Sequence, residues 1–315
     1  MMSKDGARFI LNLLGRAQPT LYWFEKRGPE FFYYYLKTRS FLLRKPSLLH
    51  FMYITNTNCT LSCKECHSWM PYYTHHHIEN FDNFKTVMDK LLRAVDLIYC
   101  LRFQGGETLM VKDLDKMVAY ACALKQICYV QVITNGTLLP SRELLDALRH
   151  PKALLSISDY SHIPQVVDKL KTATIKSLCK EREREVQCAH FLTAPGETWG
   201  PRYTIRAPYE PTVTDTAKNN YDACLCFGGD PRATFLFNGK IYLCPPAFYQ
   251  HFNDPEFFLP PEEVIDVKNS GPRELRKAIY KILSGDYFNC CSRCNAWEMR
   301  GKRYVPGVQT YCKPH

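Results

Sequence analysis

Residues 59–66 read Cys59-Thr60-Leu61-Ser62-Cys63-Lys64-Glu65-Cys66, which places three cysteines in a C-x3-C-x2-C pattern. Three thiolates on one short loop can hold three irons of a cubic four-iron cluster, and the fourth iron then stays open to another ligand. A zinc knuckle completed by His67 is the alternative interpretation. Zinc sites usually close with a second matched pair of ligands, and no such pair follows nearby.

The chain on either side of this loop alternates between strand-like and helix-like patterns. Strands are expected at about 48–57, 96–103, 128–134, 153–158 and 186–192, and helices at 80–95, 114–125, 141–149 and 165–184, the first with Asp82 as its N-cap. Such alternation predicts βα units that build a parallel sheet. Barrel-type βα folds place their active sites at the carboxyl ends of the strands.

Short polar motifs follow three of the expected strands. Gly105-Gly106-Glu107 comes after the second strand, Thr134-Asn135-Gly136 ends the third, and Ser156, Ser158 and Asp159 lie at the end of the fourth. Glycine allows another group to approach the backbone closely. An ordinary polar turn at a strand end is the alternative for each motif.

Together, the cysteine triplet and the Gly-Gly-Glu element resemble the signature of the radical S-adenosylmethionine (radical SAM) enzymes. The resemblance implies that Cys59, Cys63 and Cys66 hold a SAM-cleaving [4Fe–4S] cluster whose open iron is chelated by the methionine group of S-adenosylmethionine. Reductive cleavage would then give a 5′-deoxyadenosyl radical that abstracts a substrate hydrogen. SAM contacts are implied for Gly105, Gly106, Glu107, Asn135 and Ser158. The chain departs from many family members at Glu65, where they carry an aromatic residue.

The last third of the chain has a second cysteine pattern. Cys226 is followed by twelve residues, Gly239, four residues and Cys244, and Cys291 and Cys294 come later. Asn238-Gly239 between two apolar runs predicts a β-hairpin. The pattern resembles the "Twitch" form of the SPASM-type extension of radical SAM enzymes, which implies that these four cysteines ligate one auxiliary [4Fe–4S] cluster.

The second pattern leaves several alternatives open. Cys224 also fits the first ligand position, and Cys290 is an alternative to Cys291. A structural zinc would use the same spacings. A full SPASM extension would continue with further cysteines, whereas only Cys312 follows Cys294, so two auxiliary clusters are not expected.

These patterns predict an α/β fold, a partial (β/α)6 TIM-like barrel with additions at both ends. Residues 1–46 are expected to form an N-terminal helical extension with helices at 7–15 and 21–37, residues 47–205 the radical SAM core, and residues 206–315 the auxiliary-cluster domain. The fifteen cysteines, with no secretion signal, predict a reducing compartment and hence a cytoplasmic protein. No apolar run approaches the roughly 18 residues that a membrane span needs.

The net charge of +10 favours an anionic partner, since residues 1–50 hold nine Lys/Arg and only three Asp/Glu. An anionic small-molecule substrate fits this excess. Contact of the aromatic N-terminal segment with a membrane surface is the less favoured alternative, and an ordinary basic surface a third. The resemblance implies an external electron donor similar to flavodoxin or ferredoxin. We expect no nucleic-acid partner.

Three functions follow from these patterns. The first is an enzyme that dehydrogenates or epimerises a sugar, cyclitol or nucleotide-linked sugar, favoured because no N-terminal peptide-recognition domain is seen. The second is a peptide- or protein-modifying maturase. The third is a non-catalytic iron–sulfur or zinc protein, against which the Gly-Gly-Glu element argues. Glu65, His67 and His75 to His77 are the candidate bases, and the sequence does not choose among them.

Overall fold

The computed structural model describes residues 36, 38–180, 188–191, 196, 198–206, 210–224, 233–254, 256–285 and 287–310. The strands are β1 Ser47–Ile54, β2 Leu97–Gln104, β3 Ile127–Thr134, β4 Ala153–Ser158, β5 Cys188–Phe191, β6 Ala233–Phe237, β7 Lys240–Tyr242 and β8 Val264–Asp266. The α-helices are α4 Phe81–Ala94, α5 Leu114–Ala123, α6 Arg142–Ala147, α7 Thr172–Lys180, α8 Thr214–Ala223, α9 Pro245–Asn253, α10 Pro272–Ser284 and α11 Asn289–Ser292. Short 3-10 helices are η1 Met70–Tyr72, η2 Thr108–Met110 and η3 Val167–Lys169.

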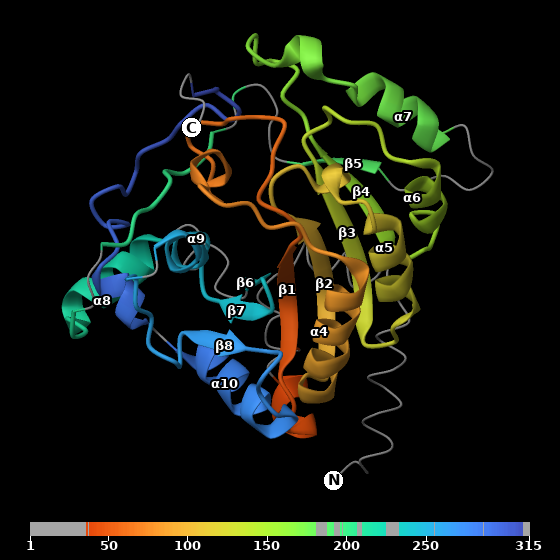
Figure 1. The fold of residues 1–315 in the computed structure, drawn as a ribbon. Helices are drawn as coiled ribbons and strands as arrows, with labels where there is room; N and C mark the ends of the chain where they lie inside the picture. Colours follow the sequence, from red (N-terminus) through yellow and green to blue (C-terminus); the bar gives the residue numbers. More distant parts are fainter. Residues whose placement is uncertain are drawn as a thin grey trace.

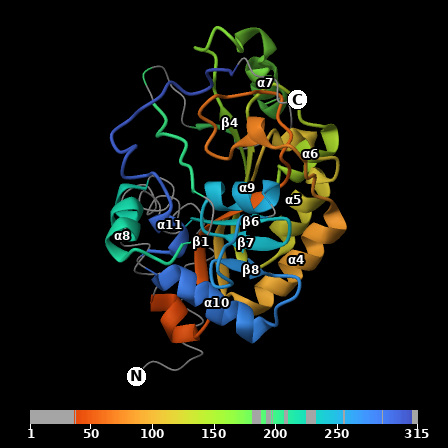
Figure 2. The same ribbon diagram turned by 60° about the vertical axis from the view of Figure 1, so that its left-hand side comes forward.

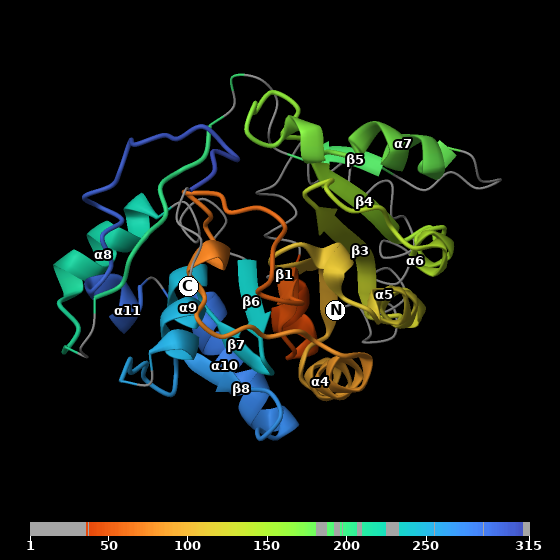
Figure 3. The ribbon, with the colours of Figure 1, turned by 45° about the horizontal axis from the view of Figure 1, so that its top comes forward.

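One eight-stranded sheet organises the described residues, in the order β5-β4-β3-β2-β1-β6-β7-β8. The strands from β5 to β6 in this order are parallel, and the hairpin strand β7 and then β8 pair antiparallel at the far edge. Helices α4, α5 and α6 lie along one face of the parallel strands (Figures 1 and 3). The predicted α/β class and parallel sheet are confirmed.

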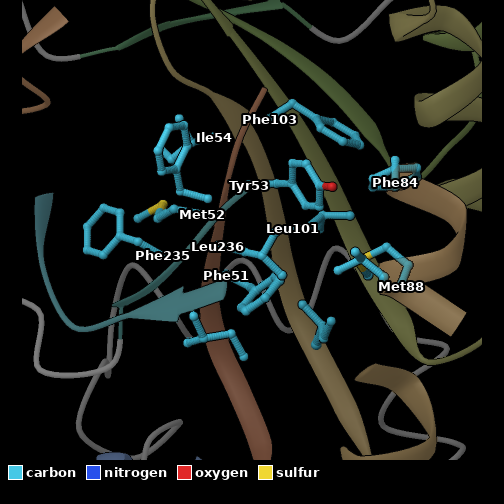
Figure 4. Packing of buried hydrophobic residues seen from close by; sticks show 14 of the residues in the cluster. Phe51, Met52, Tyr53, Ile54, Phe84, Met88, Leu101, Phe103, Phe235 and Leu236 are labelled. Atoms are coloured by element: carbon cyan, nitrogen blue, oxygen red, sulfur yellow. The ribbon is translucent and has the colours of Figure 1, made fainter. Parts of the chain in front are cut away.

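The core lies between the sheet and these helices. Phe51 and Tyr53 of β1 point toward Phe84 and Met88 of α4, whereas Met52 points to the other face of the sheet (Figure 4). The Tyr53 and Phe84 rings meet edge to face, with centroids 5.0 Å apart. This alternation follows from the two-residue period of a strand. All eight residues of β1 are buried, because β1 lies inside the sheet between β2 and β6.

The structure adds one relationship that the sequence did not predict. Strand β6, which was assigned to a separate C-terminal domain, pairs in parallel with β1 and not with β5. The hairpin from β6 to β7 forms as Asn238-Gly239 predicted, with both residues at positive φ. The sheet and the hydrophobic core therefore run without a break from residues 47–205 into the C-terminal residues. The domain boundaries themselves stay predictions.

Two local predictions were wrong. The N-cap of α4 is Asn80, whose side chain accepts a hydrogen bond from the Asn83 N–H, and not Asp82, which lies in the first turn. The single helix expected at 165–184 is instead η3 followed by α7. The predicted N-terminal helices lie outside the described residues, apart from helical residues at 36 and 38–43. Among the described helices, none has both the length and the apolar character that a membrane crossing requires.

Candidate functional site

The cysteine triplet lies in the loop that leaves the carboxyl end of β1, as predicted. This loop is bonded to the end of β2. The Thr55 N–H donates to the Gln104 carbonyl at 2.7 Å, the Gly106 N–H to the Asn56 carbonyl at 2.9 Å and the Glu107 N–H to the Asn58 carbonyl at 2.8 Å. The two strand ends therefore continue to pair past the sheet and hold the start of the cysteine loop.

Both glycines of the Gly-Gly-Glu element are required by this contact. A Cβ atom on Gly106 would lie 1.7 Å from the Asn58 carbonyl oxygen, and one on Gly105 would lie 2.3 Å from the Asn56 carbonyl oxygen. Gly105 also has a φ of +150°, which side-chain-bearing residues rarely adopt. The reason for glycine here is thus the approach of the cysteine loop, and SAM contacts for Gly105 and Gly106 stay a prediction.

Glu107 is fully buried and bonds the ends of neighbouring strands to each other. Its carboxylate accepts hydrogen bonds from Thr134 Oγ1 at 2.7 Å, the Asn135 N–H at 2.8 Å and the Leu109 N–H at 3.0 Å. Burial raises the pKa of Glu107, and these donors oppose the rise. Glu107 therefore accepts hydrogen bonds from the backbone and from Thr134, and a SAM contact for Glu107 stays a prediction.

Asn135 joins the end of β3 to the cysteine loop. Its Nδ2 donates to Cys59 Sγ at 3.5 Å and to Thr60 Oγ1 at 3.0 Å, while its Oδ1 accepts from the Thr137 N–H at 3.0 Å. A buried amide held at both ends has a fixed orientation. Asn135 therefore touches a proposed cluster ligand, and its contact with SAM stays a prediction.

Of the three loop cysteines, Cys63 is buried and Cys59 and Cys66 are partly buried, and the three thiols are close enough to influence one another. Burial raises the pKa of Cys59 and Cys66, and raises that of Cys63 to about 12, with the neighbouring thiolates contributing to the rise at Cys59 and Cys63. A cationic iron cluster reverses this balance because it binds thiolates. N–H groups of Leu61 and Gln309 already donate to the sulfurs of Cys59 and Cys63 at 3.5 Å. The donor set fits an iron–sulfur cluster with three protein ligands.

Ser158 and the histidines of the loop fall in different places. The Ser158 side chain bonds Tyr160, a buried residue whose pKa is raised by burial and by the charges of the three loop cysteines. Ser158 thus contacts the cysteine loop indirectly, through Tyr160. His75 and His76 are exposed, whereas His77 pairs with Glu79 at 3.7 Å. His75 and His76 are therefore open to solvent, and His77 is not.

A cation near the third cysteine was not found from the sequence. The Arg202 guanidinium lies against two rings that are in edge contact with each other, 4.0 Å from the centroid of Trp69 and 4.0 Å from that of Tyr72. Its charge opposes the rise that burial causes in the pKa of Cys66. Within the described part of the chain, the buried Nε and Nη1 of Arg202 have no hydrogen-bond partner. The nearby Glu65 carboxylate accepts from the backbone N–H of Arg202, at 3.3 Å, and not from its guanidinium. No sequence motif surrounds Arg202.

A second site gathers cysteines from three separate segments. The C-cap of α8 supplies Cys224, the N-cap of α9 supplies Cys244, and α11 with the following turn supplies Cys290, Cys291 and Cys294; all five line one pocket. Figure 2 shows α8 and α11 side by side. The predicted ligands Cys244, Cys291 and Cys294 are therefore brought together, and Cys226 lies outside the described residues.

The thiols of this pocket influence one another directly. Burial and then the charges of Cys244, Cys224 and Cys291 raise the pKa of Cys294. Cys290 is buried and bonds the side chains of Cys244 and Cys291. Across the described residues, no three His, Cys, Asp or Glu side chains are placed to hold a single metal ion.

One short segment connects the two sites. The Gly200 carbonyl bonds His67 Nε2 at 2.8 Å, and the Tyr203 carbonyl accepts from Trp69 Nε1 at 3.2 Å. At the other end, Ile205 forms a β-bridge with Cys294, and both Tyr203 and Ile205 line the second pocket. Residues 200–205 thus contact both cysteine sites.

Comparison with protein families finds one match. Residues 53–176 match the model of the "Radical SAM superfamily". This part of the chain, which runs from the end of β1 into α7 and includes the cysteine triplet, is similar to that superfamily. No match is found among the curated proteins.

Solved structures with similar folds include radical SAM proteins with bound AdoMet. BtrN in complex with AdoMet and 2-DOIA is 15% identical, with 84% of this chain and 96% of that chain covered and a TM-score of 0.43. The protein anSMEcpe with AdoMet and the Cp18Cys peptide is 20% identical (46% of this chain, 42% of that chain, TM-score 0.35). SuiB from Streptococcus suis with S-adenosylmethionine is 15% identical (39% and 26%, TM-score 0.30). The chain thus spans less than half of anSMEcpe and SuiB in these alignments.

Proposed function

We propose that this chain is a radical SAM enzyme that oxidises a CH–OH group of a small molecule, namely a sugar, a cyclitol or a nucleotide-linked sugar. The observation that carries the proposal is the connection of two buried cysteine sites by residues 200–205, which touch His67 and Trp69 at one end and Cys294 at the other. Two redox centres on one short segment suit a reaction that must both start and end with electron transfer.

Cys59, Cys63 and Cys66 would hold the SAM-cleaving [4Fe–4S] cluster, and Cys224, Cys244, Cys291 and Cys294 the auxiliary [4Fe–4S] cluster. Bound there, the first cluster with SAM supplies hydrogen-atom abstraction, and the second supplies a one-electron acceptor. We choose Cys224 over the predicted Cys226 because Cys224 lines the pocket and its charge acts on Cys294. Cys290 would stay a thiol that bonds the ligand sulfurs.

The reaction balances with these groups and one base. Oxidation of CH–OH to C=O removes one hydrogen atom from carbon, the hydroxyl proton and one electron. The hydrogen atom goes to the adenosyl carbon, so one 5′-deoxyadenosine and one methionine form for each carbonyl product. A flavodoxin- or ferredoxin-like donor supplies the electron that starts the cleavage. Glu65 and His67 are the candidate bases at the cysteine loop, whereas His75 and His76 face solvent.

We propose that the small molecule carries a phosphate or carboxylate group. The support is Arg202, whose guanidinium lies against the rings of Trp69 and Tyr72 with two buried donors unsatisfied among the described residues. Leaving such donors unpaired costs about 1–3 kcal/mol each, and the oxygens of an anionic group would accept hydrogen bonds from them. The adjacent Cys66 places this cation beside the proposed cleaving cluster.

Anaerobic reconstitution with iron and sulfide, followed by SAM turnover, tests the function. Cleavage to 5′-deoxyadenosine is expected, with a product two hydrogens lighter than the substrate. A product of unchanged formula that carries one non-exchangeable deuterium after turnover in deuterated water would show epimerisation instead. Modification of a peptide substrate would show a maturase, and no SAM cleavage would show a non-catalytic metal protein.

A further inference from the structure

The last described residues of the chain lie along the cysteine loop as an added strand. The Lys64 N–H donates to the Val308 carbonyl at 2.8 Å, and the Thr310 N–H donates to the Ser62 carbonyl at 2.6 Å. Between these bonds, Cys63 and Gln309 form an antiparallel bridge. Segments that are 247 positions apart in the sequence, counted from Ser62 to Gln309, are thereby paired at the middle cysteine of the triplet.

The Gln309 side chain is held at both ends of its amide. Its Oε1 accepts from the Ser62 N–H at 2.7 Å, and its Nε2 donates to Cys63 Sγ at 3.5 Å and to the Gly307 carbonyl at 2.6 Å. Its backbone N–H donates to Gln165 Oε1 at 2.8 Å. Because donor and acceptor ends are both used, the amide cannot turn over without losing these bonds.

Gly307 fixes the path of this segment. Its φ is +75°, and a Cβ atom there would lie 2.6 Å from the Tyr160 ring. Tyr160 is itself buried against the cysteine loop, in one cluster with Leu61 and Cys63. The chain therefore turns at Gly307 over a ring of the site and delivers Gln309 to Cys63.

We propose that Gln309 is a positioning residue of the SAM-cleaving site, which fixes the loop at Ser62 and raises the reduction potential of the cluster through its N–H···S bond to Cys63. The inference rests on the proposed function, in which Cys63 is a cluster ligand. An N–H donor to a ligand sulfur stabilises negative charge, and the reduced cluster carries one more negative charge than the oxidised one. Hydrogen bonds to sulfur are among the known determinants of iron–sulfur potentials.

Two substitutions in the full chain separate the two bonds of the amide. Gln309→Glu keeps an oxygen for the Ser62 N–H but cannot donate to sulfur, and Gln309→Leu loses both bonds. Val308→Ala is the matched control, because Val308 is 36% exposed and joins the loop through its backbone carbonyl. The measurement is a redox titration of the reconstituted protein, followed through the electron paramagnetic resonance signal that changes when SAM is added.

Both Gln309 variants should shift the reduced-to-oxidised ratio at fixed potential toward the oxidised form by about two- to tenfold, where tenfold is about 59 mV for one electron. Val308→Ala should leave it unchanged. If both variants keep the SAM-responsive signal at a lower potential, the role at Cys63 is supported, and a smaller signal per chain in Gln309→Leu than in Gln309→Glu supports the role at Ser62. Unchanged potentials in both variants would overturn the inference alone, and so would loss of the signal in both. A wild-type signal in Cys63→Ala would instead overturn the proposed function.

Discussion

The backbone N–H of Glu107 donates to the carbonyl oxygen of Asn58 at 2.8 Å, which bonds the end of β2 to the residue before the first loop cysteine. Glu107 then turns its carboxylate to the Asn135 N–H at the end of β3, and Asn135 returns to Cys59 through its side chain. The three strand ends are thus joined in a closed ring around the cysteine loop. Its geometry depends on how closely the backbones approach.

Gly106→Ala should disrupt this ring, because the added methyl group would lie 1.7 Å from the Asn58 carbonyl oxygen. We expect loss of iron from the first site. We also expect the free energy of unfolding to fall by about 3 kcal/mol or more, because the clash is with backbone atoms that cannot move aside easily. Iron analysis and urea denaturation measure the two effects. Gly271→Ala is the control, since no atom lies within 4 Å of a Cβ there; equal losses in both variants would contradict the explanation.

Alanine substitution of Cys59, Cys63 or Cys66 should each abolish 5′-deoxyadenosine formation and lower the iron content from about eight to about four per chain, because the open-iron cluster needs all three thiolates. The control is Cys122→Ala, which removes a buried thiol of α5 far from both motifs in sequence. Normal SAM cleavage in any of the three loop variants would refute the assignment of the first site.

Cys224 and Cys226 can be separated by iron content. We expect Cys224→Ala to lose about four irons and Cys226→Ala to keep them, because Cys224 shares the pocket of Cys244, Cys291 and Cys294. Cys290→Ala should also retain the second cluster. The reverse result for Cys224 and Cys226 would restore the assignment made from spacing, and four irons with one zinc would show a structural zinc site.

Arg202→Gln should weaken the binding of an anionic substrate by about tenfold or more, a loss of about 1.4 kcal/mol. Titration calorimetry with UDP-glucose, and with glucose as the neutral control, measures the change. Arg206→Gln is the matched control, because Arg206 is exposed and contributes its backbone to the contacts. If the wild type does not prefer the anion, or if only SAM binding weakens in Arg202→Gln, the proposed anionic substrate loses its support.

Glu79 should make stability depend on pH in the acid range. Burial raises the pKa of Glu79, but the nearby His77 ring and hydrogen bonds from Asn83 and Tyr53 outweigh it and hold the pKa below 4.5. A lowered folded-state pKa stabilises the protein above 4.5, and this contribution is lost as the pH falls through the folded-state value. Glu79→Gln should lower the free energy of unfolding by about 1.5–3 kcal/mol at pH 7. Measured by urea denaturation, the free energy of unfolding of this variant should fall less steeply at acid pH than that of the wild type. An acid limb as steep as that of the wild type would assign the pH dependence to other carboxylates.

The sequence by itself determined the strands and helices of the parallel sheet and the position of the cysteine loop after β1. The hydrophobic alternation predicted β1 to β4 with their helices, and Asn238-Gly239 predicted the hairpin of β6 and β7. The spacing of the three cysteines predicted that they lie on one short loop, because three potential ligands within eight residues form a local pattern. Such features are readable since strand period, turn preference and ligand spacing all depend on near neighbours in the chain.

Only the tertiary structure placed β6 beside β1, Cys224 in the second pocket, Arg202 against two rings and Gln309 against Cys63. The structure also explains the need for glycine at positions 105 and 106 by the close approach of the Asn56–Asn58 backbone. Arg202 and Gln309 carry no motif, and the partners of β6, Arg202 and Gln309 lie far away in sequence. Such contacts follow from how the sheet orders its strands and where the chain ends return, which no local pattern specifies.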